Sequence, residues 1–519
     1  MILGVVELAQ CSLGQVLRHQ AREYPQAAAL LSVERSLTWA QLDAEVDQLA
    51  RLLHEVGVVA GDAVGFLLTK RPEVVTGFLA CARLGAIVTP INFKLHPSHV
   101  RETLEAANVK TVLVESAFDE LLHGLLPLLP DPARIIYVGG LGLYGETDYA
   151  SVFDMEAGAV VPEPDPSSVV YYNFTSGTTG HPKGAITTHH NILQNALTAF
   201  EREGAAGLGF THDDVFLCMF SVFAHPHEIF HRSLLCGGAF VVLDTLSPRV
   251  VAQQIEQFSV RWVMAVPSFY EMLLDHANAL NYSLNSLRIL EAGGAAVAAS
   301  TLERLEDRFG ASFMPVWGST ETTGVALALR PTPGRETGTT GQPLAGYRVR
   351  VVDSRGRDCE PGVIGEMWVQ GEALCAGYVN NAEETSALFV DGWYQTRDLV
   401  RWTEQGSIQF VGRQSEMLKI GGIRVYPLEI EQVIAQHPAV RSVVVVRSEE
   451  RVRGEIARAI VQLNTGAELD ARRLAQYCRD RMAVYKVPRL IEFWDEIPLL
   501  PNGKIDKKSV LASGQRAAG

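Results

Sequence analysis

The chain has 519 residues, of which 47% are hydrophobic and 20% are charged, and its formal net charge is −14. This apolar content excludes intrinsic disorder and is typical of a large soluble globular protein with three or four structural units. The acidic balance, without a long basic run, argues against a nucleic acid or an anionic membrane surface as the main partner. It does not exclude a local phosphate-binding site.

The cysteines indicate a reducing compartment. All seven are widely scattered, odd in number and without a Cys-x-x-Cys pair, so we expect free thiols in a cytoplasmic protein rather than disulfides or a zinc knuckle. The segment from Met1 to Leu13 lacks the basic leader and the small-residue cleavage site of a signal peptide. Every apolar run falls short of the roughly 20 residues that a membrane-spanning helix needs.

Strand and helix patterns alternate in two parts of the chain. From about 60 to 140, β-branched runs alternate with segments of helical period, and the alternation returns from about 239 to 316. Such alternation predicts βαβ units with helix-covered parallel sheets, and therefore two α/β lobes. The expected strands are 63–68, 86–91, 111–114, 134–138, 239–243, 262–266 and 288–291, and two of the expected helices are 72–83 and 97–107.

The pattern changes after about residue 340. Short alternating segments broken by Gly and Asp, at 347–352, 365–369 and 407–411, predict a small antiparallel β unit, in the form of a small barrel. After Gly412 the chain has its own expected helices (428–437, 471–481) and strands (440–446, 456–463, 489–493). We therefore expect an α/β protein with a large N-terminal domain, residues 1–412, and a smaller α+β C-terminal domain, residues 413–519.

The most informative segment is the loop Thr175-Ser176-Gly177-Thr178-Thr179-Gly180-His181-Pro182-Lys183-Gly184, which follows an apolar run. Its glycines and hydroxyls expose backbone N–H groups and short donors that can surround phosphate oxygens, and Lys183 adds a mobile positive charge. It is not a Walker P-loop, because His and Pro precede the lysine and no Ser or Thr follows it. A plain surface loop would explain the Gly and Ser residues but not Pro-Lys-Gly after an apolar strand.

This segment resembles the signature of the adenylate-forming superfamily, which comprises acyl-CoA synthetases, peptide-synthetase adenylation domains and luciferases. Gly293-Gly294-Ala295-Ala296 is similar to the family's adenine-contacting turn, and Trp317-Gly318-Ser319-Thr320-Glu321 to its aromatic-Gly-x-Thr-Glu motif. Further motifs follow in the family's order, so the resemblance covers essentially the whole chain. The chain is most like a free-standing acyl-CoA ligase.

The resemblance implies a role for each matching residue. The Thr320 hydroxyl would bind the α-phosphate, and the Glu321 carboxylate would hold Mg²⁺, a hard cation that needs oxygen ligands. Asp398 matches the acid that binds the ribose hydroxyls, and Arg413 matches the arginine that contacts ribose and phosphate. Lys504 matches the lysine that bridges the substrate carboxylate and ATP during adenylation. The implied cofactors are ATP, Mg²⁺ and coenzyme A as acyl acceptor.

A second half-reaction, the attack of a thiol on the adenylate, is also implied. In the family the C-terminal domain is mobile: it rotates about the segment matching Gly412 to Ser415 and withdraws the lysine at 504. It then presents the loop matching 419–429, in which Lys419, Gly421 and Gly422 would leave a slot for a slender pantetheine arm.

Three positions depart from the family's pattern. Ser415 stands where the hinge usually has Asp or Lys, which puts charge-dependent control of the rotation in doubt. Arg397 replaces the glycine of Thr-Gly-Asp and places a bulky cation beside the ribose acid. The family's Phe-His-x-x-Gly region is irregular here, and we match His225 to its aromatic gate near the substrate carboxylate.

Two motifs suggest other functions. His227-Glu228-Ile229-Phe230-His231 satisfies the zincin pattern, in which both histidines would bind Zn²⁺, Glu228 would act as base and Glu256 could be a third ligand. Against zinc, a proline just before the motif marks a helix start, and Arg232 offers Glu228 an i,i+4 partner. The Gly-x-Gly-x-x-Gly at 140–145 is not followed by helical periodicity, so we expect a loop rather than a dinucleotide site.

We therefore expect an ATP- and Mg²⁺-dependent acid-thiol ligase that forms an acyl-AMP, releases pyrophosphate and transfers the acyl group to coenzyme A. A ligase that loads a separate carrier protein, a zinc hydrolase and a nucleotide-binding protein without turnover stay open, as do monomer and homodimer. By family analogy, the acid pocket involves 225–232, 266–269, 293–296 and 322–325. His227, His231 or Arg232 would recognise a polar group or second carboxylate there; alternatively, Arg232 pairs with Glu228 at the surface.

Overall fold

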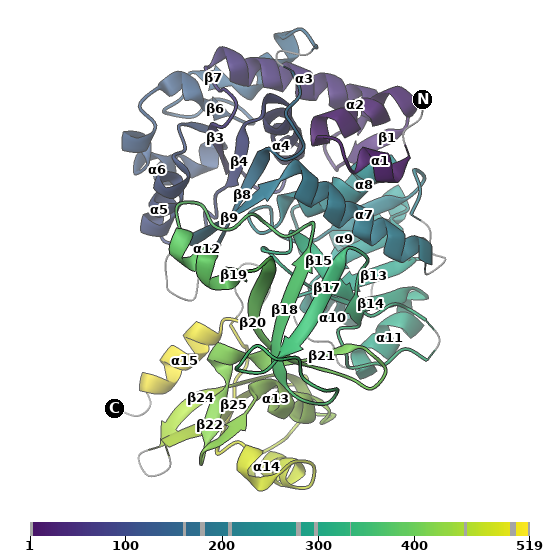
Figure 1. Cartoon of the computed structure of the whole chain (residues 1–519), viewed down its shortest axis with the longest axis vertical. Helices are drawn as coiled ribbons and strands as arrows, with labels where there is room; N and C mark the ends of the chain where they lie inside the picture. The colour runs from purple at the N-terminus through teal and green to yellow at the C-terminus, as the bar shows by residue number, and fades with distance from the viewer. Residues whose placement is uncertain are drawn as a thin grey trace.

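The computed structural model describes residues 4–158, 162–176, 182–205, 210–276, 282–294, 299–332, 334–450, 454–498 and 505–516. Two large sheets with their helices form the bulk of the molecule, and a smaller antiparallel sheet connects them to a C-terminal α+β unit (Figure 1). Among the described residues, no helix has the length and apolar character to cross a membrane. All seven cysteines are free thiols, as the sequence predicts.

The first α/β lobe contains a seven-stranded sheet of order β7-β6-β5-β3-β4-β8-β9, in which β8 and β9 are antiparallel. The βαβ alternation expected between 60 and 140 is confirmed, and residues 140–145 form a loop before β7. The strands are β3 (Ala63–Leu67), β4 (Ile87–Pro90), β5 (Thr111–Val114), β6 (Ile135–Tyr137), β7 (Thr147–Asp148), β8 (Val169–Ser176) and β9 (Pro182–Thr188). Its helices are α3 (Trp39–Glu55), α4 (Pro72–Leu84), α5 (Pro97–Ala107) and α6 (Asp119–His123).

The second lobe contains a nine-stranded sheet of order β16-β15-β14-β13-β12-β10-β11-β1-β2. The N-terminal strand β1 joins it by parallel pairing with β11, a long-range pairing that local patterns do not reveal. The strands are β1 (Ala28–Leu31), β2 (Ser36–Thr38), β10 (Val215–Cys218), β11 (Ala239–Val241), β12 (Trp262–Ala265), β13 (Ile289–Ala292), β14 (Ser312–Ser319), β15 (Gly324–Ala328) and β16 (Gln342–Pro343). The helices around it are α1 (Val5–Leu8), α2 (Leu13–Glu23), α7 (His189–Ala205), α8 (His231–Cys236), α9 (Pro248–Phe258), α10 (Pro267–His276) and α11 (Ala299–Phe309).

The small β unit is an antiparallel sheet of order β17-β18-β20-β19, with β21 also paired to β20. The expectation of a barrel is wrong, because this strand path is open in the described part of the chain. The long strand β20 occupies the centre and was not among the expected strands. The elements are β17 (Tyr347–Val352), β18 (Gly365–Gly371), α12 (Ala382–Leu388), β19 (Phe389–Val390), β20 (Trp393–Trp402) and β21 (Ile408–Arg413).

The C-terminal unit lies at the end of the molecule opposite α2 and α3, beyond β20 and β21 (Figure 1). It has its own hydrophobic core, in which Leu418, Ile430 and Leu474 are fully buried. Its elements are the 3₁₀ helix η6 (Gln414–Glu416), β22 (Leu418–Ile420), β23 (Ile423–Val425), α13 (Pro427–Ala435), β24 (Val440–Glu450), β25 (Gly454–Leu463), α14 (Ala471–Arg479), the 3₁₀ helix η7 (Val484–Lys486), β26 (Leu490–Phe493) and α15 (Lys507–Arg516). The expected helices and strands after Gly412 are thus confirmed to within a few residues.

Candidate active site

Asp398 lies where the small sheet meets the end of β14. Trp317 Nε1 donates a hydrogen bond to Asp398 Oδ2 at 2.9 Å, and Arg413 Nε lies 3.2 Å from Asp398 Oδ1. The antiparallel pairing of β20 with β21 places Asp398 directly opposite Arg413. The fold therefore brings together three residues that the sequence assigns to one nucleotide site.

The environment of Asp398 is strongly asymmetric. Its side chain is only 5% exposed, whereas that of Arg413 is 59% exposed. Burial raises the pKa of the Asp398 carboxyl above its ordinary value, although Arg413 and the Trp317 hydrogen bond act to lower it. The same ion pair raises the pKa of Arg413. The cluster thus offers hydrogen-bond acceptors at a buried acid and an outward-facing cation beside it.

Glu321 is held in the turn between β14 and β15. Tyr378 donates a hydrogen bond from its hydroxyl to Glu321 Oε1 at 2.6 Å, and the Cys375 N–H donates to the Glu321 carbonyl at 2.8 Å. Thr320 is buried, and its carbonyl accepts the Thr323 N–H at 3.1 Å. Burial, with the Glu321 charge, raises the pKa of Tyr378, so this phenol stays protonated and fixes the carboxylate.

These oxygens fit a site for Mg²⁺. Mg²⁺ in nucleotide sites keeps several waters and takes one or two protein carboxylates together with substrate phosphates. Glu321 is half-buried, and its carboxylate accepts the Tyr378 hydroxyl through Oε1. Across the described residues, no group of three or more His, Cys, Asp or Glu could hold a metal ion.

Lys183 lies at the start of β9, paired across the hairpin with Thr175 at the end of β8. Its Nζ lies 2.6 Å from Oε1 of Glu384, a residue in the first turn of α12. Arg397 Nη1 lies 3.8 Å from the same oxygen. Ser176 ends β8, while Gly177, Thr178 and Thr179 lie outside the described residues.

The expected adenine turn follows β13. Gly294 adopts a left-handed φ of 88°, and a Cβ on Gly293 would lie 3.1 Å from Val316 Cγ2 and 3.8 Å from Phe220 Cζ. The turn is therefore closely packed, which small residues permit. Ala295, Ala296 and Lys504 lie outside the described residues.

The three histidines of the irregular segment form a row of rings. His225 is half-buried, its ring centroid 5.9 Å from that of His227, which is 5.3 Å from that of the fully buried His231. His227 lies in the 3₁₀ helix η5 (Pro226–Ile229) and His231 begins α8, so the zincin motif does not lie on one helix. His227 Nε2 donates to the carbonyl of Thr323 at 3.0 Å, so this nitrogen is not available to a metal. Burial lowers the pKa of His227 to about 4, so this ring is neutral.

Arg232 is buried, not at the surface, and the surface-pair expectation is wrong. It forms an ion pair with the fully buried Glu291, and Glu228 lies farther away at 3.8 Å. Trp262 Nε1 donates to Glu291 at 3.0 Å, and the guanidinium lies over the Phe216 ring at 5.2 Å. Because its guanidinium is already paired with the Glu291 carboxylate, we interpret Arg232 as a core residue rather than as a receptor for a second carboxylate.

The C-terminal residues of the predicted thiol channel lie in the β22–β23 hairpin. Lys419 is in β22, and its N–H donates to Glu455 Oε2 at 2.6 Å. Gly421 and Gly422 form the turn with left-handed φ values of 58° and 83°. The hairpin belongs to the C-terminal unit, whereas Asp398 lies in β20 and Glu321 in the turn between β14 and β15.

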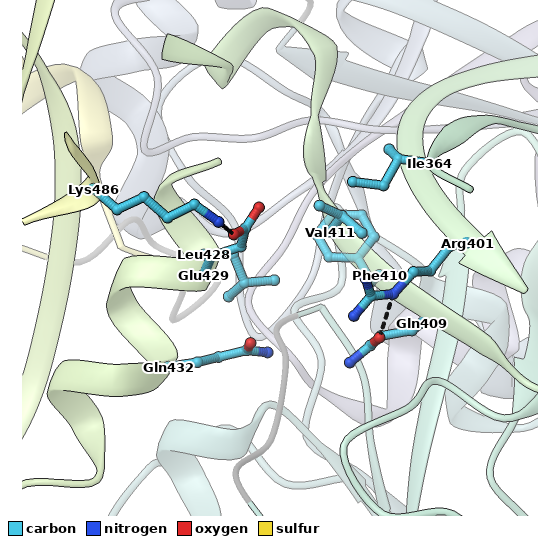
Figure 2. A pocket seen from close by; sticks show the side chains of 9 residues that line it. All are labelled: Ile364, Arg401, Gln409, Phe410, Val411, Leu428, Glu429, Gln432 and Lys486. Atoms are coloured by element: carbon cyan, nitrogen blue, oxygen red, sulfur yellow. Dashed lines mark hydrogen bonds and ion pairs between the residues drawn. The ribbon is translucent and has the colours of Figure 1, made fainter. Parts of the chain in front are cut away.

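A cavity of about 210 Å³ separates the small sheet from the C-terminal unit (Figure 2). Arg401, Gln409 and Phe410 line it from β20 and β21, while Gln432 and the Glu429–Lys486 ion pair line it from α13 and η7. Ile364, Val411 and Leu428 also line it, so the two units meet around this gap through both polar and apolar side chains.

Sequence reasoning missed Glu384 and Tyr378. Asn381, whose side chain accepts the Glu384 N–H at 3.1 Å, is a recognisable N-cap and could have located α12. No local pattern reveals that Glu384 pairs with a lysine 201 residues earlier in the chain. Strand β9 makes that contact, because the segment carrying Tyr378 pairs with it through Ala185.

Comparisons with known proteins agree with this geometry. A family model described as AMP-binding enzyme matches residues 17–379, and one described as AMP-binding enzyme C-terminal domain matches 429–504. An indoleacetate–CoA ligase of Aromatoleum aromaticum is 30% identical over 95% of this chain and 96% of that protein. A feruloyl-CoA synthase of Amycolatopsis sp. is 31% identical over 96% and 98%. The structure of the anthranilate CoA ligase AuaEII with anthranoyl-AMP is 26% identical with a TM-score of 0.89, covering 99% of this chain and 100% of that one. These likenesses confirm the adenylate-forming resemblance, and the chain belongs to the AMP-binding enzyme family.

Proposed function

We propose that this chain is an ATP-dependent ligase that activates an aromatic carboxylic acid as its acyl-AMP and transfers the acyl group to coenzyme A. The observation that carries the proposal is the joining of Trp317, Asp398 and Arg413 into one cluster by a hydrogen bond and an ion pair. It occurs in a chain whose full-length relatives include an indoleacetate–CoA ligase and a feruloyl-CoA synthase.

Each residue of the proposed site has a task in the first half-reaction. Asp398 accepts hydrogen bonds from the ribose hydroxyls, and Arg413 contacts the ribose and phosphate from the exposed side. Lys183 and Lys504 neutralise the two anions that must approach each other, the carboxylate and the triphosphate. This positioning and charge stabilisation supplies most of the catalysis, because phosphoryl chemistry needs little covalent help from a protein. Glu321 and Thr320 would hold Mg²⁺ and the α-phosphate, and the cation, when bound, neutralises charge on the phosphate oxygens.

The second half-reaction requires a different arrangement of the C-terminal unit. Lys419, Gly421 and Gly422 lie in the β22–β23 hairpin of the C-terminal unit, and a cavity lies between that unit and the small sheet that carries Asp398. We place that boundary at residue 412, giving domains 1–412 and 413–519, with rotation about Gly412 to Ser415. Closure around the acyl-AMP would protect it from hydrolysis.

The class of acid follows from the residues next to the adenine turn. Phe220 is half-buried beside Gly293, and its ring centroid lies 6.5 Å from that of His225. Two rings in that position suit a flat aromatic acid, which gains from offset or edge-to-face contacts. The aromatic acids named in the relatives above support this class.

The test is carboxylate-dependent exchange of labelled pyrophosphate into ATP with arylacetic, cinnamic, benzoic and fatty acids. We expect exchange with at least one aryl acid and a loss of roughly 100-fold in Lys504→Ala, since that side chain acts in the transition state. The matched control is Lys508→Ala, an exposed lysine in α15 that should leave exchange unchanged. Absence of exchange with every acid class would overturn the proposal.

A second assay identifies the acceptor. With the preferred acid, formation of acyl-CoA is compared with acylation of a holo-carrier protein, and we expect coenzyme A to be used.

We also place the enzyme in the cytoplasm, where ATP and coenzyme A are available and its seven free thiols stay reduced. Whether it works as a monomer or homodimer is measured by light scattering at assay concentrations.

A further inference from the structure

Arg397 has an unusual backbone for a large side chain. Its φ is 60°, in the left-handed region, where a residue with a Cβ costs roughly 1 to 2 kcal/mol relative to the right-handed form. Glycine adopts this conformation without that cost. A charged residue retained here is expected to contribute something that glycine cannot.

The bend at this position accounts only for the backbone. Strand β20 bulges against β18, because Glu366 pairs with Leu399 while Trp368 pairs with Gln395. Thr396 Oγ1 stabilises the bulge by donating to the Met367 carbonyl at 2.7 Å. The bulge turns Asp398 toward Trp317 and Arg413, as bulges near active sites commonly re-aim a side chain. Glycine would serve equally well, so the guanidinium needs a separate explanation.

The Arg397 side chain lies beside the pair formed by Lys183 and Glu384. Glu384 Oε1 is 2.6 Å from Lys183 Nζ and 3.8 Å from Arg397 Nη1. The exposed fractions of the three side chains are 10% for Lys183, 19% for Glu384 and 50% for Arg397. One carboxylate oxygen is therefore shared between a nearly buried lysine in close contact and an arginine at the rim that is slightly too far for a tight ion pair.

This geometry creates a problem for nucleotide binding. To contact the incoming phosphates, Lys183 must move away from Glu384. That would leave a mostly buried carboxylate unpaired, which is unfavourable for the free energy of binding. Arg397 is the nearest described cation that can replace it. Its exposed, flexible side chain needs only a small movement to pair with Glu384.

We propose that Arg397 is a positioning residue for the adenylation step: it pairs with Glu384 in place of Lys183, so that Lys183 can contact the phosphates of ATP. This inference rests on the proposed function, because it requires a nucleoside triphosphate beside Lys183. Arg397 itself acts through Glu384 and need not touch the nucleotide.

The test is a double-mutant cycle on ATP affinity, measured by calorimetry and by the split between KM for ATP and kcat. Arg397→Gly should raise both Kd and KM for ATP by roughly 3- to 10-fold with little change in kcat, the range of a single partly exposed ion pair. Arg397→Lys should stay within about threefold of the unaltered enzyme, since it keeps the charge. In a Glu384→Gln background, the effect of Arg397→Gly should fall below about twofold, because no carboxylate then competes for Lys183.

The matched control is Asp391→Gly, which relieves a left-handed φ of 51° at an exposed turn between β19 and β20. It should change the urea midpoint without changing the affinity for ATP. An effect of Arg397→Gly that is equally large with and without Glu384, or one confined to the urea midpoint, would overturn the inference. Failure of the unaltered enzyme to bind ATP would instead remove the proposed function, so the two failures are distinguishable.

Discussion

At the scale of single residues, the molecule buries several charges, and each is held by specific partners. Asp398 is held by Trp317 and Arg413, and Arg232 by Glu291. A buried charge whose partner is removed is strongly destabilising, whereas an exposed ion pair contributes little. The two clusters therefore differ: the Asp398 cluster is exposed on its Arg413 side and can contact a ligand, whereas the Arg232–Glu291 pair is buried and can stabilise only the core.

Asp398→Asn should separate activity from stability. Burial raises the pKa of Asp398 in the folded state. At pH values between the ordinary carboxyl pKa and this raised pKa, the folded protein therefore binds a proton that the unfolded chain has lost. The stability contributed by this group thus falls as pH rises through that window, and above it the ionised form costs the folded state. We expect Asp398→Asn to be at least as stable as the unaltered enzyme at pH 7, with KM for ATP at least about tenfold higher.

Urea unfolding at several pH values and steady-state kinetics measure both quantities. The asparagine can still accept the Trp317 hydrogen bond, so the fold is preserved. A parallel loss of stability and activity at pH 7 would contradict this account.

Glu291→Ala should destabilise the core by about 3 to 5 kcal/mol, because it leaves the Arg232 guanidinium buried without its main partner. Replacing both residues by apolar ones, as Arg232→Met with Glu291→Leu, should recover most of the loss. Urea unfolding measures the free energy. The control is Glu105→Ala, which removes an exposed i,i+4 partner of Arg101 and should cost less than about 1 kcal/mol. Equal effects in Glu291→Ala and the control would show that the buried pair does not stabilise the core.

At the scale of elements, irregular strands set the site. β20 bulges to aim Asp398, and β14 shifts register between Trp317 and Gly318 as it pairs with β15. A Cβ on Gly318 would lie 2.2 Å from the carbonyl oxygen of Gly324 on the facing strand. The two strands approach so closely there that only glycine fits, and this approach positions the turn carrying Thr320 and Glu321.

Gly318→Ala should therefore lower kcat/KM by roughly 100-fold, the effect of displacing catalytic groups by about 1 Å. Steady-state kinetics measure the loss, and circular dichroism establishes that the variant is folded. Gly124→Ala is the control, since its backbone is right-handed and the nearest atom to its Cβ would be 3.6 Å away. Kinetics in Gly318→Ala as good as in the control would show that the turn tolerates the shift.

At the scale of the whole molecule, two α/β lobes and the small sheet meet a C-terminal unit with its own core. The connection passes through Arg413, with an extended backbone of φ −102° and ψ 144°, and η6. Across this boundary, polar and apolar side chains surround the cavity of Figure 2, so part of the boundary lacks direct packing. A short extended connection followed by a 3₁₀ turn is a suitable hinge.

Gln414→Pro should hold the hinge in the present arrangement. Gln414 is the first residue of η6, a position that proline favours, and the extended backbone of Arg413 suits the residue before a proline. We expect one half-reaction to stay within about threefold of the unaltered rate and the other to fall at least about tenfold. Pyrophosphate exchange measures adenylation, and thioester formation from preformed acyl-AMP measures transfer. Gln414→Ala is the control, and an equal fall in both half-reactions would contradict a hinge at this residue.

The sequence by itself determined the alternation of strands and helices, the C-terminal elements and the order of the motifs, because helix and strand periodicity and turn chemistry are local properties. It also predicted the residues that meet at Asp398. Only the tertiary structure placed β1 beside β11, left the small sheet open, buried Arg232 against Glu291 and set Glu384 between Lys183 and Arg397. Each of these depends on contacts between segments far apart in the chain, which local patterns do not encode. The left-handed backbone of Arg397 is of the same kind, because the pairing of β18 with β20 imposes it.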